Sequence, residues 1–385
     1  EGLKFPDIKG PHALRYEMDD DLAQLFFDTM EKIAPYDSVN KEFQFVDEGL
    51  NYYRYRAIEY LEKEEHRQLY QKRNITVEGT SRRLARIMQI LLIKRLESSF
   101  TAFKTSLRNL QRYTQNMLDM LNDDAVFICP DIDVNAELDT EAKSLKTGKR
   151  ITRAMCYEDI RRKIEQKGGN NREYRVADFS PNYKTGLEAD KQIIDSLVRR
   201  WDRETKDPKL FKFLKEINRT LFDNKINNPH GYDAQKLVIF TEAIDTVNEL
   251  KEKIESISDY KVLAVTAKNR DNLQNAIQAN FDANAKEKKD DYDIIITTEV
   301  LAEGVNLHRS NVIVNYDSPW NSTRLMQRIG RVNRIGSKED FVHVFNFMPT
   351  AQSEAQIGLV QKAHAKLQAF HAMFGEDNKV FTDAE

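Results

Sequence analysis

The 385-residue sequence is poor in cysteine and in long apolar runs. Its two cysteines, Cys129 and Cys156, form neither a disulfide framework nor a metal-ligand pattern. The longest apolar runs, such as residues 90–93, end at a charged residue, far short of the ~20 apolar residues that a membrane helix requires. The amino terminus lacks the apolar stretch of a signal peptide. We therefore expect a protein of the reducing cytoplasm that has no membrane partner.

A phosphate-binding loop is also absent. Such a loop follows the pattern Gly-x-x-x-x-Gly-Lys-Ser/Thr after a strand. The sole Gly-Lys pair, Gly148-Lys149, is followed by Arg150, and Lys143 occupies the position of the first glycine. No Asp-Glu-x-His box follows a strand-like run, and the seven histidines form no His-x-x-x-His pair. We therefore expect neither a bound metal ion nor a tightly bound cofactor in this chain.

Charge is segregated along the chain, although the formal net charge is −3. Residues 67–112 contain eleven Lys or Arg and two acids, whereas residues 119–141 contain eight acids and no base. An apolar stripe runs through the basic stretch, so many of its arginines, including Arg82, Arg83 and Arg86, are expected to point away from the core. Two interpretations stay open, a solvated helix face or a surface that faces nucleic acid.

Residues 51–206 are predicted to be largely helical, after a mixed lead-in over residues 1–50 that includes a short helix at 21–33. Within this region, apolar residues recur at three- and four-residue steps from Leu84 onward. A single helix of ~40 residues would span ~60 Å. Because that is long for a compact domain, a bend is expected at Ser98-Ser99.

From residue 207 onward, short apolar runs alternate with helical patterns. The runs are expected to form five strands, at residues 237–241, 261–266, 293–298, 311–316 and 342–347. This alternation predicts an α/β domain over residues 207–350, in which helices cover both faces of a parallel sheet. In such sheets, functional groups gather at the carboxyl ends of the strands. The last segment, residues 351–385, is expected to begin with a closing helix.

Residues 327–336 read Gln-Arg-Ile-Gly-Arg-Val-Asn-Arg-Ile-Gly and are expected to continue a helix. Arg328, Arg331 and Arg334 step by three residues, so we expect them to project from one side of that helix. Their charges would repel each other unless an anion lay between them. A polyphosphate fits, because arginine is planar, permanently charged and bidentate. Gly330 costs ~1 kcal/mol inside a helix, which suggests a close backbone approach at that position.

This segment resembles motif VI of superfamily 2 helicases, and the Ile-Gly that ends it is similar to the Swi/Snf-like branch. Five other segments carry the resemblance: residues 94–99 (Lys-Arg-Leu-Glu-Ser-Ser, similar to bacterial members), 207–210 (Asp-Pro-Lys-Leu), 238–241 (motif IV), 298–307 (motif V) and 317–321 (Asp-Ser-Pro-Trp-Asn). The resemblance covers residues 207–350 and implies a RecA-like fold. Asn333 and Ser337 replace the His and Gln that are usual in eukaryotic remodellers, which favours a bacterial type.

The resemblance assigns roles to individual residues. It implies that Arg331 and Arg334 are arginine fingers, which stabilise charge that develops on the γ-phosphate of ATP. The nucleotide side of the site is implied to include Gly304, Asn306, Gln327, Arg328 and Gly330. The implied contacts to nucleic acid are Thr241, Thr298 and Trp320. Backbone contacts of this kind give little sequence preference.

The resemblance also implies a first RecA-like lobe, which would supply the phosphate-binding loop and the Mg²⁺ ligands that this chain lacks. We expect that lobe to precede residue 1 in the full-length protein. ATP and Mg²⁺ would then bind between the lobes, and closure of the lobes would drive movement along nucleic acid, with DNA favoured over RNA. The isolated chain is expected to be inactive.

Two alternatives stay open. A non-catalytic RecA-like module that binds nucleic acid or protein would use the same arginines to hold phosphate. A helicase that unwinds strands and a translocase that moves along a duplex would share all of these motifs. The sequence therefore predicts the C-terminal half of a nucleic-acid-dependent ATPase without choosing between unwinding and translocation.

Overall fold

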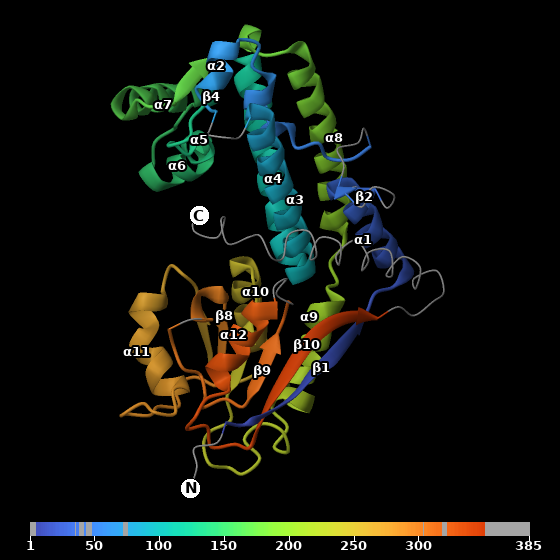
Figure 1. The fold of residues 1–385 in the computed structure, drawn as a ribbon, viewed down its shortest axis with the longest axis vertical. Helices are drawn as coiled ribbons and strands as arrows, with labels where there is room; N and C mark the ends of the chain where they lie inside the picture. The colour runs from blue at the N-terminus through green and yellow to red at the C-terminus, as the bar shows by residue number, and fades with distance from the viewer. Residues whose placement is uncertain are drawn as a thin grey trace. The chain divides into compact units, whose positions relative to one another are not determined.

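The computed structural model describes residues 5–34, 36–37, 42–43, 48–71, 76–302, 304–317 and 322–350. The chain folds into two compact units, whose elements are labelled in Figure 1. The sheet unit comprises Glu1–Met30, Ile93–Thr105 and Asp202–Glu385. The helical unit comprises Glu31–Leu92 and Ser106–Trp201.

These units divide the chain at other places than the sequence ranges 1–50, 51–206 and 207–350. The amino-terminal residues belong with the sheet, and so does Ile93–Thr105 from the middle of the predicted helical region. The closing helix predicted within residues 351–385 lies outside the described residues.

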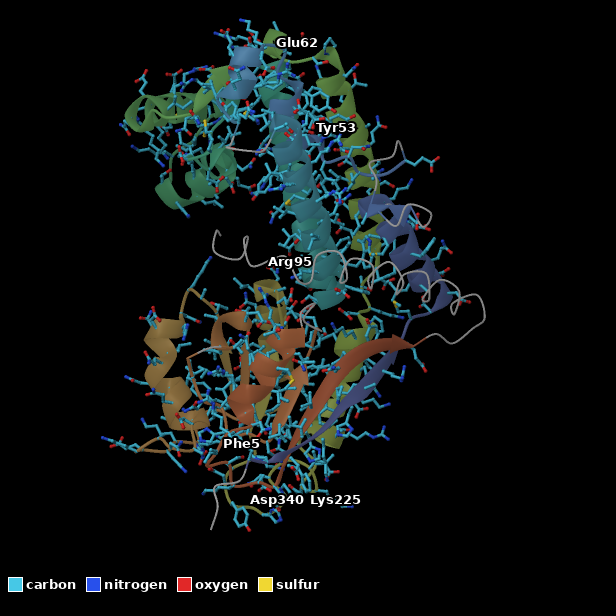
Figure 2. The ribbon with its side chains drawn as sticks, in the orientation of Figure 1. Phe5, Tyr53, Glu62, Arg95, Lys225 and Asp340 are labelled. Atoms are coloured by element: carbon cyan, nitrogen blue, oxygen red, sulfur yellow. The ribbon has the colours of Figure 1, made fainter. Side chains whose placement is uncertain are left out.

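The sheet unit is built on six strands in the order β1-β10-β9-β6-β8-β7, and every neighbouring pair is parallel. The strands are β1 (Asp7–Glu17), β6 (Leu237–Phe240), β7 (Val262–Val265), β8 (Ile294–Thr297), β9 (Val312–Asn315) and β10 (Phe341–Thr350). Figure 2 shows Phe5, two residues before β1, and Asp340, directly before β10, at the same end of the sheet, as parallel strands require. All five predicted strands are confirmed.

Helices cover both faces of this sheet, which confirms the predicted α/β architecture. One apolar layer contains Leu237 and Ile239 of β6, packed with residues of α9 (Pro208–Glu216) and α10 (Ile244–Ile257). The other layer contains Val238 and Phe240, packed with residues of α11 (Arg270–Phe281) and α12 (Ser322–Val332). Successive β6 side chains thus enter opposite layers, as a pleated strand requires. Two short helical turns complete the unit, the π-turn η4 (Ile217–Leu221) and the 3-10 turn η5 (Glu299–Leu301).

The sixth strand, β1, was not predicted. Gly10 and Pro11 indicate a break, and the register with β10 does shift between Lys9 and His12. The strand nevertheless continues on both sides of the shift. Because β1 lies at the sheet edge and only Leu14 along it is buried, it lacks the apolar run that marks the central strands.

Long helices dominate the helical unit. The helical run is interrupted at the predicted place, because Ser99 separates α3 (Val77–Ser98) from α4 (Phe100–Asn122). The other helices of this unit are α2 (Glu64–Gln68), α5 (Val134–Leu138), α6 (Thr140–Thr147), α7 (Arg153–Lys167) and α8 (Pro181–Arg203), whereas most of α1 (Asp20–Ile33) belongs to the sheet unit. Three 3-10 turns join them: η1 (Tyr53–Tyr55), η2 (Ala57–Tyr60) and η3 (Val176–Asp178). No helix among the described residues is long and apolar enough to span a membrane.

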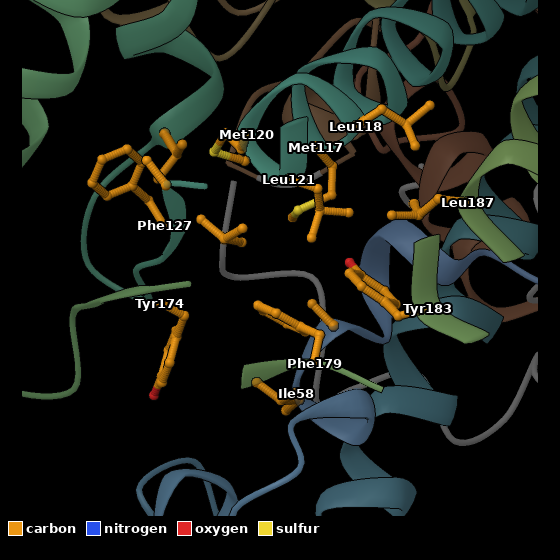
Figure 3. Close-up of a cluster of buried hydrophobic side chains, with 14 of the residues drawn as sticks. Ile58, Met117, Leu118, Met120, Leu121, Phe127, Tyr174, Phe179, Tyr183 and Leu187 are labelled. Atoms are coloured by element: carbon orange, nitrogen blue, oxygen red, sulfur yellow. The ribbon is translucent and has the colours of Figure 1, made fainter. Parts of the chain in front are cut away.

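Two small antiparallel pairs accompany these helices, and the sequence indicated neither. They are β2 (Tyr36–Asp37) with β3 (Glu42–Phe43), and β4 (Val126–Ile128) with β5 (Arg172–Tyr174). The core of the unit joins Met117, Leu121, Phe127 and Tyr183, which come from α4, β4 and α8 (Figure 3). Residues 122–206 therefore fold onto the end of the long helices, although their sequence matched no known segment.

Candidate nucleotide and nucleic-acid site

Polar side chains collect at the carboxyl edge of the sheet, where the parallel strands end. Thr241 directly follows β6, Thr298 directly follows β8, and Asp317 lies two residues after β9. Because these strands are neighbours in the order β9-β6-β8, the three residues are brought to one edge. This is the edge at which ligands bind in parallel α/β sheets.

Asp317 is the centre of a buried hydrogen-bond network at this edge. Its Oδ2 atom accepts from the hydroxyls of Thr241 and Ser98, each at 2.6 Å. Both carboxylate oxygens also accept from the backbone N–H of Glu242 at 2.9 Å. Thr241 is fully buried, so its hydroxyl is committed to the protein itself.

Helix α12 carries Arg328 and Arg331. The side chain of Arg328 points into the protein. Arg328 is 0% exposed. Its Nε donates to Oε1 of Glu299 at 2.8 Å, and its Nη1 donates to Oδ1 of Asn315 at 3.0 Å and to the carbonyl of Asp317 at 3.1 Å. The anion beside Arg328 is therefore a carboxylate of the protein, and this position holds α12 to β9.

The two predicted finger residues lie near the end of α12 and are half-buried. Nη1 of Arg331 is 3.4 Å from the carbonyl of Val305, and the carbonyl of Arg331 accepts from the N–H of Leu307 at 2.9 Å. Nε of Arg334 donates to the carbonyl of Gly330 at 3.1 Å. The structure thus brings Arg331 next to the segment that resembles motif V.

The remaining nucleotide candidates lie in the same part of the sheet unit. Gly304 has φ of +79°, and a Cβ there would come within 2.7 Å of a guanidinium nitrogen of Arg270. The positive φ therefore favours glycine here, whereas the end of the flexible Arg270 side chain could move aside for a Cβ. The side-chain amide of Asn306 donates to Oδ2 of Asp282 at 3.3 Å. Gln327 is half-buried on α12.

Gly330 was expected to mark a close backbone approach, yet a Cβ at this position would meet no atom within 4 Å. Nothing within the described chain therefore requires glycine here, and this side of α12 is open. Thr298, predicted to contact nucleic acid, is half-buried at the carboxyl edge. Trp320 lies outside the described residues.

The basic candidates of the helical unit lie on α3. Arg82 and Arg83 are exposed and Arg86 is half-buried, as the apolar stripe predicted. The acidic stretch 119–141 forms ion pairs with other bases: Asp119 with Arg153 at 2.9 Å, Glu137 with Lys143 at 2.7 Å, and Asp139 with Arg112 at 2.8 Å.

Several residues of this edge were missed by sequence reasoning. Glu299 neutralises Arg328, Arg270 packs over Gly304, and Ser98 and Lys209 connect distant segments to Asp317. A signal for the last two was present, because residues 94–99 and 207–210 both resembled family segments without a known role. Glu299 and Arg270 themselves had no comparable signal.

A RecA-like sheet whose carboxyl edge carries an arginine-bearing helix defines the class of helicase-type motor lobes. Residues 216–336 match the helicase conserved C-terminal domain. This match confirms the predicted resemblance of this part of the chain to the C-terminal lobe of superfamily 2 helicases.

Individual proteins show the same similarity. The uncharacterized ATP-dependent helicase YqhH of Bacillus subtilis is 29% identical over 156 residues, which cover 37% of this chain and 26% of that protein. The RNA polymerase-associated protein RapA of Erwinia tasmaniensis is 37% identical over 84 residues, 22% of this chain and 8% of that protein. The solved C-terminal part of the Fun30 ATPase domain is 13% identical with a TM-score of 0.35, covering 93% of this chain and 90% of that one. The matched part of the chain thus spans about a quarter of the length of YqhH.

Proposed function

We propose that the sheet unit supplies arginine fingers to a nucleic-acid-dependent ATPase, a helicase or DNA translocase of Swi/Snf-like type. The observation that carries this proposal is the difference in burial between Arg328 and the two arginines that follow it, Arg331 and Arg334. Arg328 is buried and neutralised by Glu299, so it fixes the helix. Arg331, beside Val305, and Arg334, beside Gly330, remain partly accessible, so a second molecule can reach them.

The chemistry of this surface fits a polyphosphate. Two guanidiniums lie on one helix end, and the backbone at Gly330 is open to another molecule. Among the described residues, no three His, Cys, Asp or Glu side chains gather as metal ligands. The Mg²⁺ ligands and the phosphate-binding loop are therefore assigned to a first RecA-like lobe of the full-length protein.

In this arrangement ATP supplies the phosphoanhydride bond, and the residues of this chain hold and orient its phosphate end. Arg331 and Arg334 stabilise the charge that develops as the γ-phosphate is transferred, a contribution of ~10³–10⁵ in rate for arginine fingers. Gly304, Asn306 and Gln327 line the nucleotide side of the site. The interior contacts of Arg328 keep the finger-bearing helix in place.

Nucleic acid is proposed to pass the carboxyl edge of the sheet, with backbone phosphates held near Thr298 and DNA favoured over RNA. Thr298 is better placed than Thr241 to contact a ligand, because the Thr241 hydroxyl already donates to Asp317. The exposed arginines of α3 are a separate candidate surface for the phosphate backbone.

The proposal is tested in the full-length protein by substituting Arg331→Ala and measuring nucleic-acid-stimulated ATP turnover and ATP affinity. Turnover should fall at least ~10³-fold, while ATP affinity changes little, since fingers act mainly in the transition state. Arg324→Ala, which removes a half-buried arginine from the same helix, is the matched control and should retain turnover. Normal turnover in Arg331→Ala would instead favour a non-catalytic module that grips phosphate.

A further inference from the structure

The break between α3 and α4 lies at the end of residues 94–99 and is contacted by residues 207–210, the two segments that resemble family segments without a known role. We call residues 97–100 the α3–α4 joint, and they belong to the sheet unit. Ser99 caps α4, because its hydroxyl accepts from the N–H of Ala102 at 3.1 Å. The N–H of Phe100 donates to Oδ2 of Asp207 at 3.3 Å. The first turn of α4 thus receives two oxygen acceptors, one of them a carboxylate.

The end of α3 is held by a buried lysine from the same segment as Asp207. Nζ of Lys209 donates to the carbonyls of Glu97 at 2.7 Å and Ser98 at 2.9 Å. Lys209 is 6% exposed, and burial lowers its pKa while Asp317 and Asp207 oppose that shift. An ammonium at one helix end and a carboxylate at the start of the next match both helix dipoles. Hydrogen bonds from Asp207 and Lys209 therefore fix the backbone of the α3–α4 joint.

Ser98 connects this joint to the finger-bearing helix. Its hydroxyl donates to Oδ2 of Asp317 at 2.6 Å and also lies 2.9 Å from Oγ1 of Thr246. The carbonyl of the same Asp317 accepts from Nη1 of Arg328 at 3.1 Å. One residue, Asp317, therefore lies between the α3–α4 joint and α12, and Ser98, Asp317 and Arg328 are all buried.

We propose that Ser98 and Lys209 are positioning residues, which set the place of α12 through Asp317 and Arg328. The helices that meet at the joint continue into the helical unit, as residues 77–92 of α3 and 106–122 of α4. A displacement of either helix at the joint thus moves the acceptors that hold Arg328. The effect on α12 is independent of the proposed function, and the effect on turnover rests on it.

The first test uses this 385-residue chain and amide hydrogen exchange. Ser98→Ala removes the donor to Asp317 and should speed exchange of the α12 amides by roughly tenfold, leaving α11 and β7 unchanged. Lys209→Met should do the same for α12 and α4. The matched control is Ser310→Ala, since Ser310 is a buried serine with two backbone acceptors at the other end of β9. If Lys209→Met fails to fold, Ser98→Ala decides the outcome alone.

The second test measures ATP turnover in the full-length protein. Ser98→Ala should lower kcat several-fold with KM for ATP unchanged, whereas Ser310→Ala should alter neither. Unchanged α12 exchange in Ser98→Ala, or equal loosening of α12 in Ser310→Ala, overturns the positioning role. Loosened α12 with normal kcat overturns its catalytic consequence. Absence of turnover in the unmodified protein contradicts the proposed function, and the exchange result still decides the inference.

Discussion

The carbonyl of Asp317 accepts a hydrogen bond from the guanidinium of Arg328 at 3.1 Å, while the carboxylate of the same Asp317 accepts from Ser98 and Thr241. One residue thus binds the end of β9 to α12 on one side and to α3 and β6 on the other. This relationship makes Arg328 a structural residue and distinguishes it from Arg331 and Arg334, which are proposed to serve a ligand.

Arg328→Met should destabilise the sheet unit by about 3 kcal/mol, because it leaves the Glu299 carboxylate and two buried acceptors without their donor. The measurement is urea unfolding of the variant beside Arg324→Ala, which should lose less than about 1 kcal/mol. Equal, small losses in both variants would show that Arg328 does not hold α12.

Asp190 should make the helical unit less stable as pH rises from about 4 to about 6. It accepts hydrogen bonds from the N–H groups of Asn51 and Tyr53, each at 2.8 Å, but burial raises its pKa to about 6. Within that window the folded protein binds more protons than the unfolded chain, so the free energy of unfolding falls with pH, by about 3 kcal/mol in total.

Asp190→Asn should remove this contribution. The quantity to compare is the change in unfolding free energy between pH 4 and pH 7 in the two proteins, which cancels the constant cost of the substitution. An identical pH dependence in both would contradict the raised pKa.

The isolated chain should show negligible ATP turnover with or without nucleic acid. Its sequence has no phosphate-binding loop, and no metal-ligand cluster is present in the described part of the chain. A preparation free of contaminating ATPase that turned over ATP at ~1 s⁻¹, an ordinary enzymatic rate, would contradict the assignment of the catalytic loop to another lobe.

The exposed face of α3 should bind nucleic acid weakly and with strong salt dependence, about one power of salt for each phosphate contacted. Replacing Arg82, Arg83 and Arg86 together by Glu should abolish this binding. A triple replacement of Lys251, Lys253 and Lys261 by Glu changes the net charge equally and serves as the control. Equal binding by both triple variants, or binding of the unmodified chain that ignores salt, would identify the α3 arginines as an ordinary solvated face.

The central strands and their helices could be predicted because each is a short apolar run or an amphipathic period, and both patterns reflect burial directly. The bend at Ser98-Ser99 could be predicted from helix length alone. By contrast, β1 was not predicted, because an edge strand with one buried residue shows no apolar run. The small β4–β5 pair escaped because three-residue strands carry too little pattern.

The sequence predicted the location of the candidate site, but it did not predict which of its side chains are buried or which residues they contact. A three-residue step turns a helix by about −60°, so Arg328 and Arg331 face different directions, and α12 ends at Val332, before Arg334. The spacing of the arginines therefore could not show that Arg328 is buried while Arg331 and Arg334 stay partly exposed. The contacts of Ser98 with Asp317 and of Lys209 with Ser98 join residues more than a hundred positions apart, and no local pattern encodes such a pairing.

The pairing of β1 with β10 has a consequence for synthesis. The two strands are separated by about 330 residues, with Asp7 opposite Phe341. At a ribosomal rate of ~5–20 residues per second, β1 waits roughly 20–60 s for its partner. Throughout that interval β1 lacks its partner strand, and a nascent chain in this state is open to strand exchange with a neighbouring copy on the same messenger.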